Sequence, residues 1–192
     1  MALPPVTTGD LPGPALALIE LESIARGMIA ADALLKRAPV SIALAEAITP
    51  GKYLLLFSGG VAEVQESFAA GLEVAGTALL DKLLLPVAAR SLVDGLRGKL
   101  HGGQGESVGI VETHTVASAL LAADSALKGA DVRLTQLHLA RGIGGKGYFV
   151  LTGELHQVEA GLQAAAAAIE ARLLVGTELL QRPHPELRGP VL

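Results

Sequence analysis

The chain has 192 residues, a net charge of −4 at pH 7 and 51% hydrophobic residues, few of them aromatic. So much apolar surface excludes a disordered chain, and the absence of cysteine excludes disulfide frameworks, thiolate zinc sites, catalytic thiols and Cys-ligated iron–sulfur clusters. The acidic balance lacks the clustered Lys and Arg that nucleic acid or anionic lipid requires, so we expect no nucleic acid and no membrane as partner.

The N-terminal residues 1–14 are expected to form a tail. They have no basic segment and are interrupted by Asp10 and several prolines, which is not the pattern of a signal peptide. No stretch of the chain approaches the roughly 20 apolar residues that a membrane-spanning helix requires. These features favour a location in the cytoplasm.

A strand, a helix and a hairpin are predicted next. Residues Ala15–Glu22 alternate aliphatic with small or charged residues, which is typical of a strand. Ser23 is a candidate N-cap for a helix whose last turn carries Lys36. The apolar residues at helical spacing predict its buried face: Ile24, Met28, Ala31 and Leu35. Two extended runs, Val40–Ile48 and Lys52–Ser58, flank a short glycine-containing loop and predict a β-hairpin.

A second helix and a short strand complete this unit. The apolar positions of the helix are Val61, Val64, Phe68, Leu72 and Ala75. The strand is predicted near Leu83–Leu85. The order is therefore β-α-β-β-α-β, and we place the first domain at residues 15–97.

The second half of the chain repeats this pattern. Aligning Glu20–Val40 with Glu112–Val132, an offset of 92 residues, gives nine identities in twenty-one positions. In an Ala-rich chain only about two or three identities are expected by chance, so the chain contains an internal duplication. Further along the chain the offset becomes 94 residues, and Gly51-Lys52 matches Gly145-Lys146.

The stretch at residues 98–105 is rich in glycine and suits a flexible linker between the copies. We place the second domain at residues 106–183 and a C-terminal tail at 184–192. The strands expected in the second copy are Ser107–Glu112, Val132–Ala140, Lys146–Thr152 and Leu173–Gln181. Its first helix follows Thr113 or Thr115 as N-cap.

The helices of the second copy have the same apolar spacing as those of the first. These positions are Val116, Leu120, Ala123 and Leu127 in one helix, and Leu155, Val158, Leu162, Ala165 and Ile169 in the other. The predicted fold class is α+β, with two tandem ferredoxin-like β-α-β-β-α-β sandwiches whose helices cover one face of an antiparallel sheet.

A glycine-rich motif in the second hairpin satisfies the dinucleotide-binding pattern G-x-G-x-x-G, with Gly142, Gly144 and Gly147 in the required places. A dinucleotide site requires a helix that opens on these glycines, whereas Tyr148–Thr152 continues as a strand. The context therefore argues against a nucleotide. The five histidines show no metal-ligand spacing, so we expect no metal site.

Three repeated features leave functional and structural interpretations open. Glu20 and Glu112 end the first strand of each copy, where a carboxylate can act in catalysis or, more simply, cap a helix or pair with a neighbour. Lys36 and Lys128 complement a helix dipole or mark a duplicated surface. The glycine loops of the hairpins are simple turns, or tips that converge on a ring axis.

These residues resemble bacterial microcompartment shell proteins, specifically the non-permuted, tandem-domain class that forms pseudohexameric trimers. In that family the first strand ends in Ile/Val-Glu and the next helix contains Ala-Ala-Asp-x-x-x-Lys-x-Ala. Here the matching residues are Ile19-Glu20 with residues 30–38, and Val111-Glu112 with residues 122–130. The resemblance spans about residues 15–183.

The resemblance implies a structural shell protein and not an enzyme. Three chains of a homotrimer would supply six wedge-shaped domains to a flat tile, which abuts other shell proteins, hexameric and pentameric tiles, around encapsulated enzymes. The residues that match the family's tile edge are Lys36, Lys128 and Arg182. The first copy departs from the family at the position of the edge arginine, because Leu85 precedes Pro86 there.

The resemblance also implies a central pore for small metabolites. The residues at the family's pore position are Thr49, Pro50, Gly51, Ile143, Gly144 and Gly145. Backbone amides there would donate hydrogen bonds to polar or anionic solutes, although Pro50 has no N–H and Ile143 adds apolar bulk. Some tandem relatives hold an iron–sulfur cluster at this axis through cysteine, which this chain does not have, so we expect no cofactor.

Two other functions compete with the shell role. The first is a small-molecule-binding or regulatory protein on the same duplicated fold, with the hairpin loops as its ligand pocket. The second is an enzyme that works through Glu20 and Glu112, which no base, metal or nucleophile constellation supports in the sequence. Lateral assembly into sheets would distinguish the shell protein from both.

Overall fold

A computed structural model describes residues 11–100 and 105–187 of the chain. Contacts divide these residues into two compact units. The first-repeat unit comprises residues up to 88 together with 140–145, and the second-repeat unit comprises the remaining residues from 89 onward. Residues 1–10, 101–104 and 188–192, which belong to the expected N-terminal tail, linker and C-terminal tail, lie outside the described residues.

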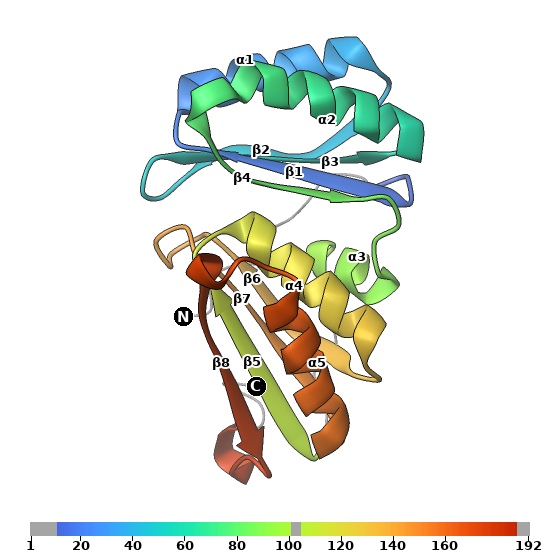
Figure 1. The fold of residues 1–192 in the computed structure, drawn as a ribbon, viewed down its shortest axis with the longest axis vertical. Helices are drawn as coiled ribbons and strands as arrows, with labels where there is room; N and C mark the ends of the chain where they lie inside the picture. The colour runs from blue at the N-terminus through green and yellow to red at the C-terminus, as the bar shows by residue number, and fades with distance from the viewer. Residues whose placement is uncertain (1–10, 101–104, 188–192) are drawn as a thin grey trace. The chain divides into compact units, whose positions relative to one another are not determined.

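The first-repeat unit is a two-layer sandwich, with helices α1 and α2 on one face of a four-stranded sheet (Figure 1). The strand order is β2-β3-β1-β4, and all neighbouring strands are antiparallel. The elements are β1 (Ala15–Leu21), α1 (Ile24–Arg37), β2 (Ser41–Ile48), β3 (Lys52–Gly59), α2 (Val61–Ala75), the 3₁₀ turn η1 (Gly76–Ala78) and β4 (Leu79–Leu85).

The second-repeat unit has the same topology, with strand order β6-β7-β5-β8. Its elements are α3 (Arg90–Leu96), β5 (Ser107–Thr113), α4 (Val116–Gly129), β6 (Arg133–Leu139), β7 (Gly147–Gly153), α5 (Leu155–Ala167), the 3₁₀ turn η2 (Ala171–Leu173), β8 (Leu174–Gln181) and the 3₁₀ turn η3 (Pro185–Leu187). The predicted fold class is confirmed: each repeat is a β-α-β-β-α-β unit with an antiparallel sheet.

The central strand β1 is buried along its whole length. Alternate residues of a strand point to opposite faces of the sheet. One set, Ala15, Ala17, Ile19 and Leu21, joins the core beneath the helices with Phe57, Val64 and Phe68. The other set, Leu16, Leu18 and Glu20, is equally buried, which places a carboxylate inside an otherwise aliphatic environment.

Helix α1 faces the core with a different stripe from the one predicted. Its buried residues are Gly27, Ala30 and Leu34, whereas Ile24, Met28 and Leu35 are exposed, so that part of the prediction is wrong. The true face lies one residue earlier in each turn. Gly27 and Ala30 make this stripe the less apolar of the two, but their small size lets the helix approach the sheet closely.

Helix α4, the equivalent of α1, buries both stripes. The predicted residues Val116, Leu120 and Ala123 are buried, and so are Ala119, Ala122 and Ala126, which correspond to the buried stripe of α1. Helix α3 packs against α4 and β6 and accounts for part of this burial. Helix α3 is not predicted from the sequence pattern; it lies before residue 97 but groups with the second-repeat unit.

The predicted caps of α1 and α4 are confirmed. The Ser23 side chain accepts a hydrogen bond from Arg26 N in α1. Of the two candidates in the second copy, Thr115 is the N-cap and accepts from Ser118 N at 3.2 Å. The Thr113 hydroxyl instead donates to the Thr115 carbonyl at 2.7 Å and fixes the turn that precedes the helix.

We predict that Gly27→Ala lowers the melting temperature of the protein. A Cβ at Gly27 would lie 2.3 Å from Tyr53 Cδ1 and 2.8 Å from Tyr53 Cβ, so a helix or strand backbone must shift. Such overpacking costs about 1–3 kcal/mol, which outweighs the about 1 kcal/mol that alanine gains over glycine inside a helix. Gly176→Ala, where a Cβ meets nothing within 4 Å, is the control and should leave thermal unfolding nearly unchanged. A higher melting temperature for Gly27→Ala would contradict the close approach.

Candidate functional site

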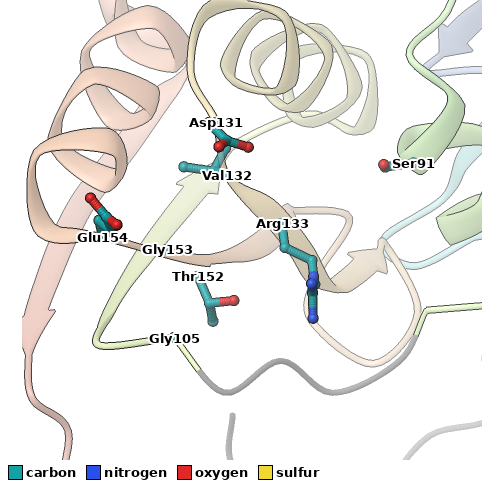
Figure 2. Close-up of a pocket in the computed structure, with 8 residues that line it drawn as sticks. All are labelled: Ser91, Gly105, Asp131, Val132, Arg133, Thr152, Gly153 and Glu154. Carbon is teal, nitrogen blue, oxygen red and sulfur yellow. The ribbon is translucent and has the colours of Figure 1, made fainter.

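The second-repeat unit contains a polar hollow of about 380 Å³ that the sequence analysis did not predict (Figure 2). Arg133 at the start of β6, the 96% buried Thr152 of β7 and Glu154, the N-cap of α5, line it. The full lining is Ser91, Gly105, Asp131, Val132, Arg133, Thr152, Gly153 and Glu154. These residues come from separate segments without a shared spacing, so no sequence motif announces them.

The lining of the hollow is polar and suits a small polar solute. One guanidinium and two carboxylates line it beside two hydroxyls, and none of the eight residues is a histidine or lysine that could activate Ser91 or Thr152. No group of three or more metal-binding side chains occurs within residues 11–100 and 105–187. Among the helices described, none is long and apolar enough to cross a membrane.

The predicted pore residues lie on two hairpin tips that belong to the same compact unit. Residues 140–145, the tip between β6 and β7, group with the first repeat and its own tip at 49–51. Gly51, Gly144 and Gly145 have φ values of 106°, 67° and 78°, a region that glycine adopts without strain. Both tips therefore present backbone groups in place of side chains at these positions.

Two basic side chains connect these tips to their surroundings. Arg141 donates from Nε and Nη2 to the two carboxylate oxygens of Glu46, at 2.9 and 2.6 Å. This bidentate hydrogen bond raises the pKa of the Arg141 guanidinium above its usual value, so the group stays charged. Lys52 Nζ donates to the Gly145 carbonyl at 3.4 Å, which joins the strand that follows one tip to the other tip. The structure thus brings the predicted pore residues Gly51 and Gly145 into one neighbourhood.

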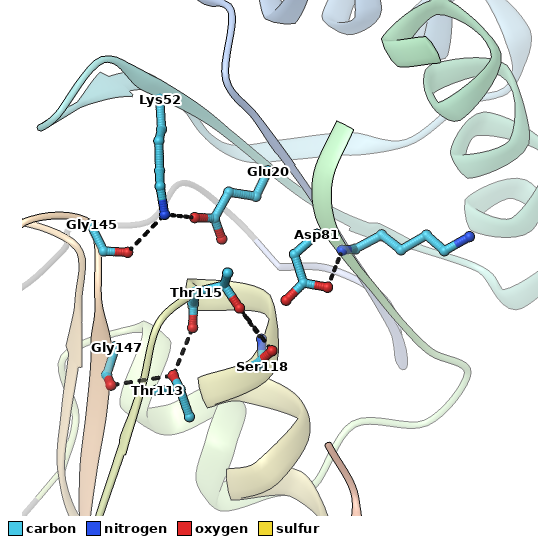
Figure 3. Close-up of polar contacts among 9 residues, drawn as sticks. Glu20, Lys52, Asp81, Thr113, Thr115, Ser118, Gly145 and Gly147 are labelled. Atoms are coloured by element: carbon cyan, nitrogen blue, oxygen red, sulfur yellow. Dashed lines mark hydrogen bonds and ion pairs between the residues drawn. The ribbon is translucent and has the colours of Figure 1, made fainter. Parts of the chain in front are cut away.

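The glutamate and lysine that recur in both repeats pair with each other, and Figure 3 shows the pair of the first repeat. Lys52 Nζ donates to Glu20 Oε1 at 2.7 Å, and Lys146 Nζ donates to Glu112 Oε1 at 2.8 Å. The Glu20 side chain is 0% exposed, whereas that of Glu112 is 41% exposed. Each glutamate therefore has a cationic partner. This agrees with the expectation that the two carboxylates pair with a neighbouring residue.

The predicted edge residues all lie at the surface, in different environments. Lys36 pairs with Asp32 at 2.6 Å and Lys128 with Asp124 at 2.5 Å, each one turn apart on a helix. Arg182 follows β8 with a positive φ of 52° and lies 3.6 Å from Glu106. The two aspartates differ most: the side chain of Asp32 is 59% exposed and that of Asp124 is 5% exposed.

Comparison with known proteins accounts for the duplication. The BMC domain family matches residues 15–88 and 107–183, one match in each repeat. The chain is 41% identical over 174 residues to the bacterial microcompartment shell protein PduT of Citrobacter freundii, covering 90% of this chain and 95% of PduT.

Solved structures show the same architecture. A microcompartment protein from Desulfitobacterium hafniense superimposes with a TM-score of 0.78 at 37% identity, covering 90% of this chain and 97% of the other. A fused permuted hexameric shell protein from the RMM microcompartment has a TM-score of 0.59 at 21% identity over 79% of each chain, a likeness of fold alone. Because the BMC domain matches most of the chain in two copies, this chain belongs to the bacterial microcompartment shell proteins, as a member with two BMC domains in tandem.

Proposed function

We propose that this shell protein is a non-catalytic facet tile: a homotrimer with a pseudohexagonal outline, in the shell of a bacterial microcompartment within the cytoplasm. Two BMC domains in one chain supply the six domains of such a ring from three copies. A closed ring places each repeat in an equivalent position, so a surface that is buried in one repeat should be buried in the other once the ring is complete.

The observation that carries the trimer is the unequal burial of equivalent helices. Met28 of α1 is 57% exposed, whereas its counterpart in α4, Leu120, is 0% exposed. The other exposed apolar residues of α1 are Ile24, Ile29 and Leu35. Of these, Ile24 and Leu35 share one helix face with Met28. An exposed apolar face of this kind favours a protein–protein contact, and the duplication favours a second copy of the chain as the partner.

We predict that Met28→Asp prevents trimer formation. Burial of a carboxylate in an apolar interface costs more free energy than the contact returns. Light scattering should show a particle of three 19.6 kDa chains for the unmodified protein and a smaller particle for the variant. Gln163→Asp, on the exposed surface of α5, is the matched control and should remain a trimer. A Met28→Asp protein that keeps the trimer mass would place the contact elsewhere.

The same proposal assigns lateral contacts to the exposed cations Lys36, Lys128 and Arg182. These side chains would contact neighbouring tiles, which include other copies of the trimer and the hexameric and pentameric shell proteins; encapsulated enzymes would be further partners. Their exposure and their positions at the ends of helices or of a strand support this role. Surface cations of this kind add little to the stability of the single chain, so they remain available for contacts between tiles.

Replacing both Lys36 and Lys128 with Ala should abolish ordered sheets and leave the trimer intact. Negative-stain electron microscopy of concentrated protein detects the sheets, and light scattering of the same sample reports the oligomer. The control pair Lys82→Ala with Arg172→Ala removes two other exposed cations and should not affect the sheets. Loss of the trimer in the first double variant would contradict an edge role.

We further propose that the tips at 49–51 and 143–145 line a pore on the axis of the trimer. Their positive φ values and backbone-rich surface support passage of small polar or anionic metabolites. The two tips differ, because Pro50 supplies no N–H and Ile143 adds an apolar side chain. Such a pore would therefore alternate in chemistry around the axis.

A bulky substitution, Gly144→Tyr, should slow solute passage without changing assembly. A Cβ at Gly144 meets no atom within 4 Å, so the ring would extend into free space, although the positive φ adds some strain. The measurement is the turnover of a reporter enzyme enclosed in reconstituted shells, compared with turnover after the shells are opened. Gln163→Tyr, on the exposed surface of α5, serves as the control. Unchanged turnover in shells that contain Gly144→Tyr would argue against an axial pore.

The polar hollow favours a second candidate, the small-molecule-binding protein. The 96% buried Thr152 and the guanidinium of Arg133 could orient a polar ligand there. Sheet formation distinguishes the two functions, because a sensor remains a closed oligomer whereas a tile associates through its edges.

A further inference from the structure

Helix α3 shows how the segment that follows the first repeat is held. Its N-cap residue, Ala89, donates its backbone N–H to Asp124 Oδ1 on α4 at 2.7 Å. Leu92 and Leu96 are fully buried in the second-repeat unit, where α3 packs on α4 and β6. The seat therefore consists of one aspartate that anchors the start of the segment and an apolar surface that receives its leucines.

The segment that follows the second repeat also carries a leucine at the position equivalent to Leu92, but this leucine is not buried against the chain. Leu16 pairs with Leu85, and its counterpart Val108 pairs with Leu180, so the ends of the repeats align with an offset of 95 residues. This offset places His184 at the position of Ala89 and Leu187 at that of Leu92. The turn η3 thus begins where α3 begins, yet Leu187 is 37% exposed and Leu92 is 0% exposed.

The first repeat, in turn, has the seat without a segment. Asp32 is the counterpart of Asp124 and pairs with Lys36 through Oδ2, as Asp124 pairs with Lys128 through Oδ2. In Asp124 the other oxygen, Oδ1, accepts the N–H of Ala89. The Asp32 side chain remains 59% exposed. On β2, Ala45 is also exposed, whereas its counterpart Leu137 lies beside α3.

We propose that the segment at residues 184–187 of one copy docks on α1 and β2 of a second copy, as α3 docks on α4 and β6 within each chain. Asp32 Oδ1 then accepts the backbone N–H of residue 184 of the neighbouring copy, and Leu187 packs against the apolar surface beside it. Within one chain both halves of the contact are exposed, which identifies a second copy as the source of the segment. The inference rests on the proposed trimer, because a ring of alternating repeats supplies one such segment to each seat.

An engineered disulfide tests this contact directly, because the chain contains no cysteine. The test protein carries Asp32→Cys and His184→Cys, and the matched control carries Asp124→Cys and Ala89→Cys. After mild oxidation, denaturing gels without reductant should show covalent dimers and trimers for the test protein. The control should give a cross-linked monomer of altered mobility. The docking would be overturned if the test protein is a trimer in solution but stays monomeric on the gel while the control forms its disulfide. The proposed trimer would then still hold.

Deletion of residues 184–192 provides a second measurement that does not depend on cross-linking. Hydrogen exchange of the trimer should become at least several-fold faster at the C-terminal half of α1 and at the start of β2, and α4 should keep its protection. Unchanged exchange in α1 would also overturn the docking. Light scattering separates the two hypotheses: a test protein and a parent chain that are both non-trimeric would contradict the proposed function together with this inference.

Discussion

A carboxylate buried on a central strand requires a cation, and in the first repeat this requirement fixes the position of the hairpin tip. Glu20 is enclosed within β1, whose other residues are all aliphatic, and Lys52, the first residue of β3, supplies the charge at 2.7 Å. An unpaired buried carboxylate would cost several kcal/mol, so the loop that ends at Gly51 must return to this place. The ion pair therefore couples the core of the sandwich to the surface proposed to face the pore.

The equivalent pair in the second repeat is exposed to solvent and therefore contributes less to stability. Glu112 and Lys146 are each about two-fifths exposed, and exposed pairs contribute only about 0–1 kcal/mol. Removal of one partner from the buried pair would cost about 3–5 kcal/mol. The first tip is thus anchored through charge. The second tip depends on its glycines and on Arg141, whose guanidinium donates two hydrogen bonds to Glu46. A ring of three such chains would have threefold, not sixfold, chemistry at its axis.

Much of the fold was predictable because the duplication reports each element twice. Hairpins and caps depend on local chemistry, so the sequence predicts the Ser23 cap and the glycine loops and narrows the second cap to Thr113 or Thr115. Spacing does not predict the buried face of α1, because its exposed stripe is more apolar than the buried stripe of Gly27 and Ala30. The Glu–Lys pairs join residues 32 and 34 positions apart across strands, and the polar hollow gathers short segments. Such contacts depend on register and tertiary packing, which periodicity does not encode.

Three pairs of equivalent positions differ in the same way, in that one member is buried within the chain and the other is exposed. Leu120, Asp124 and Leu92 are satisfied within the chain, whereas Met28, Asp32 and Leu187, at the equivalent places, remain exposed. A gene duplication alone would leave both copies equally open or equally closed. One closed and one open set of surfaces is what a ring needs, because each copy then offers one unsatisfied face and one unsatisfied segment to its neighbours. In the proposed trimer, closure after three copies would satisfy every face, which would limit this mode of association and leave the outer cations to govern the proposed contacts between tiles.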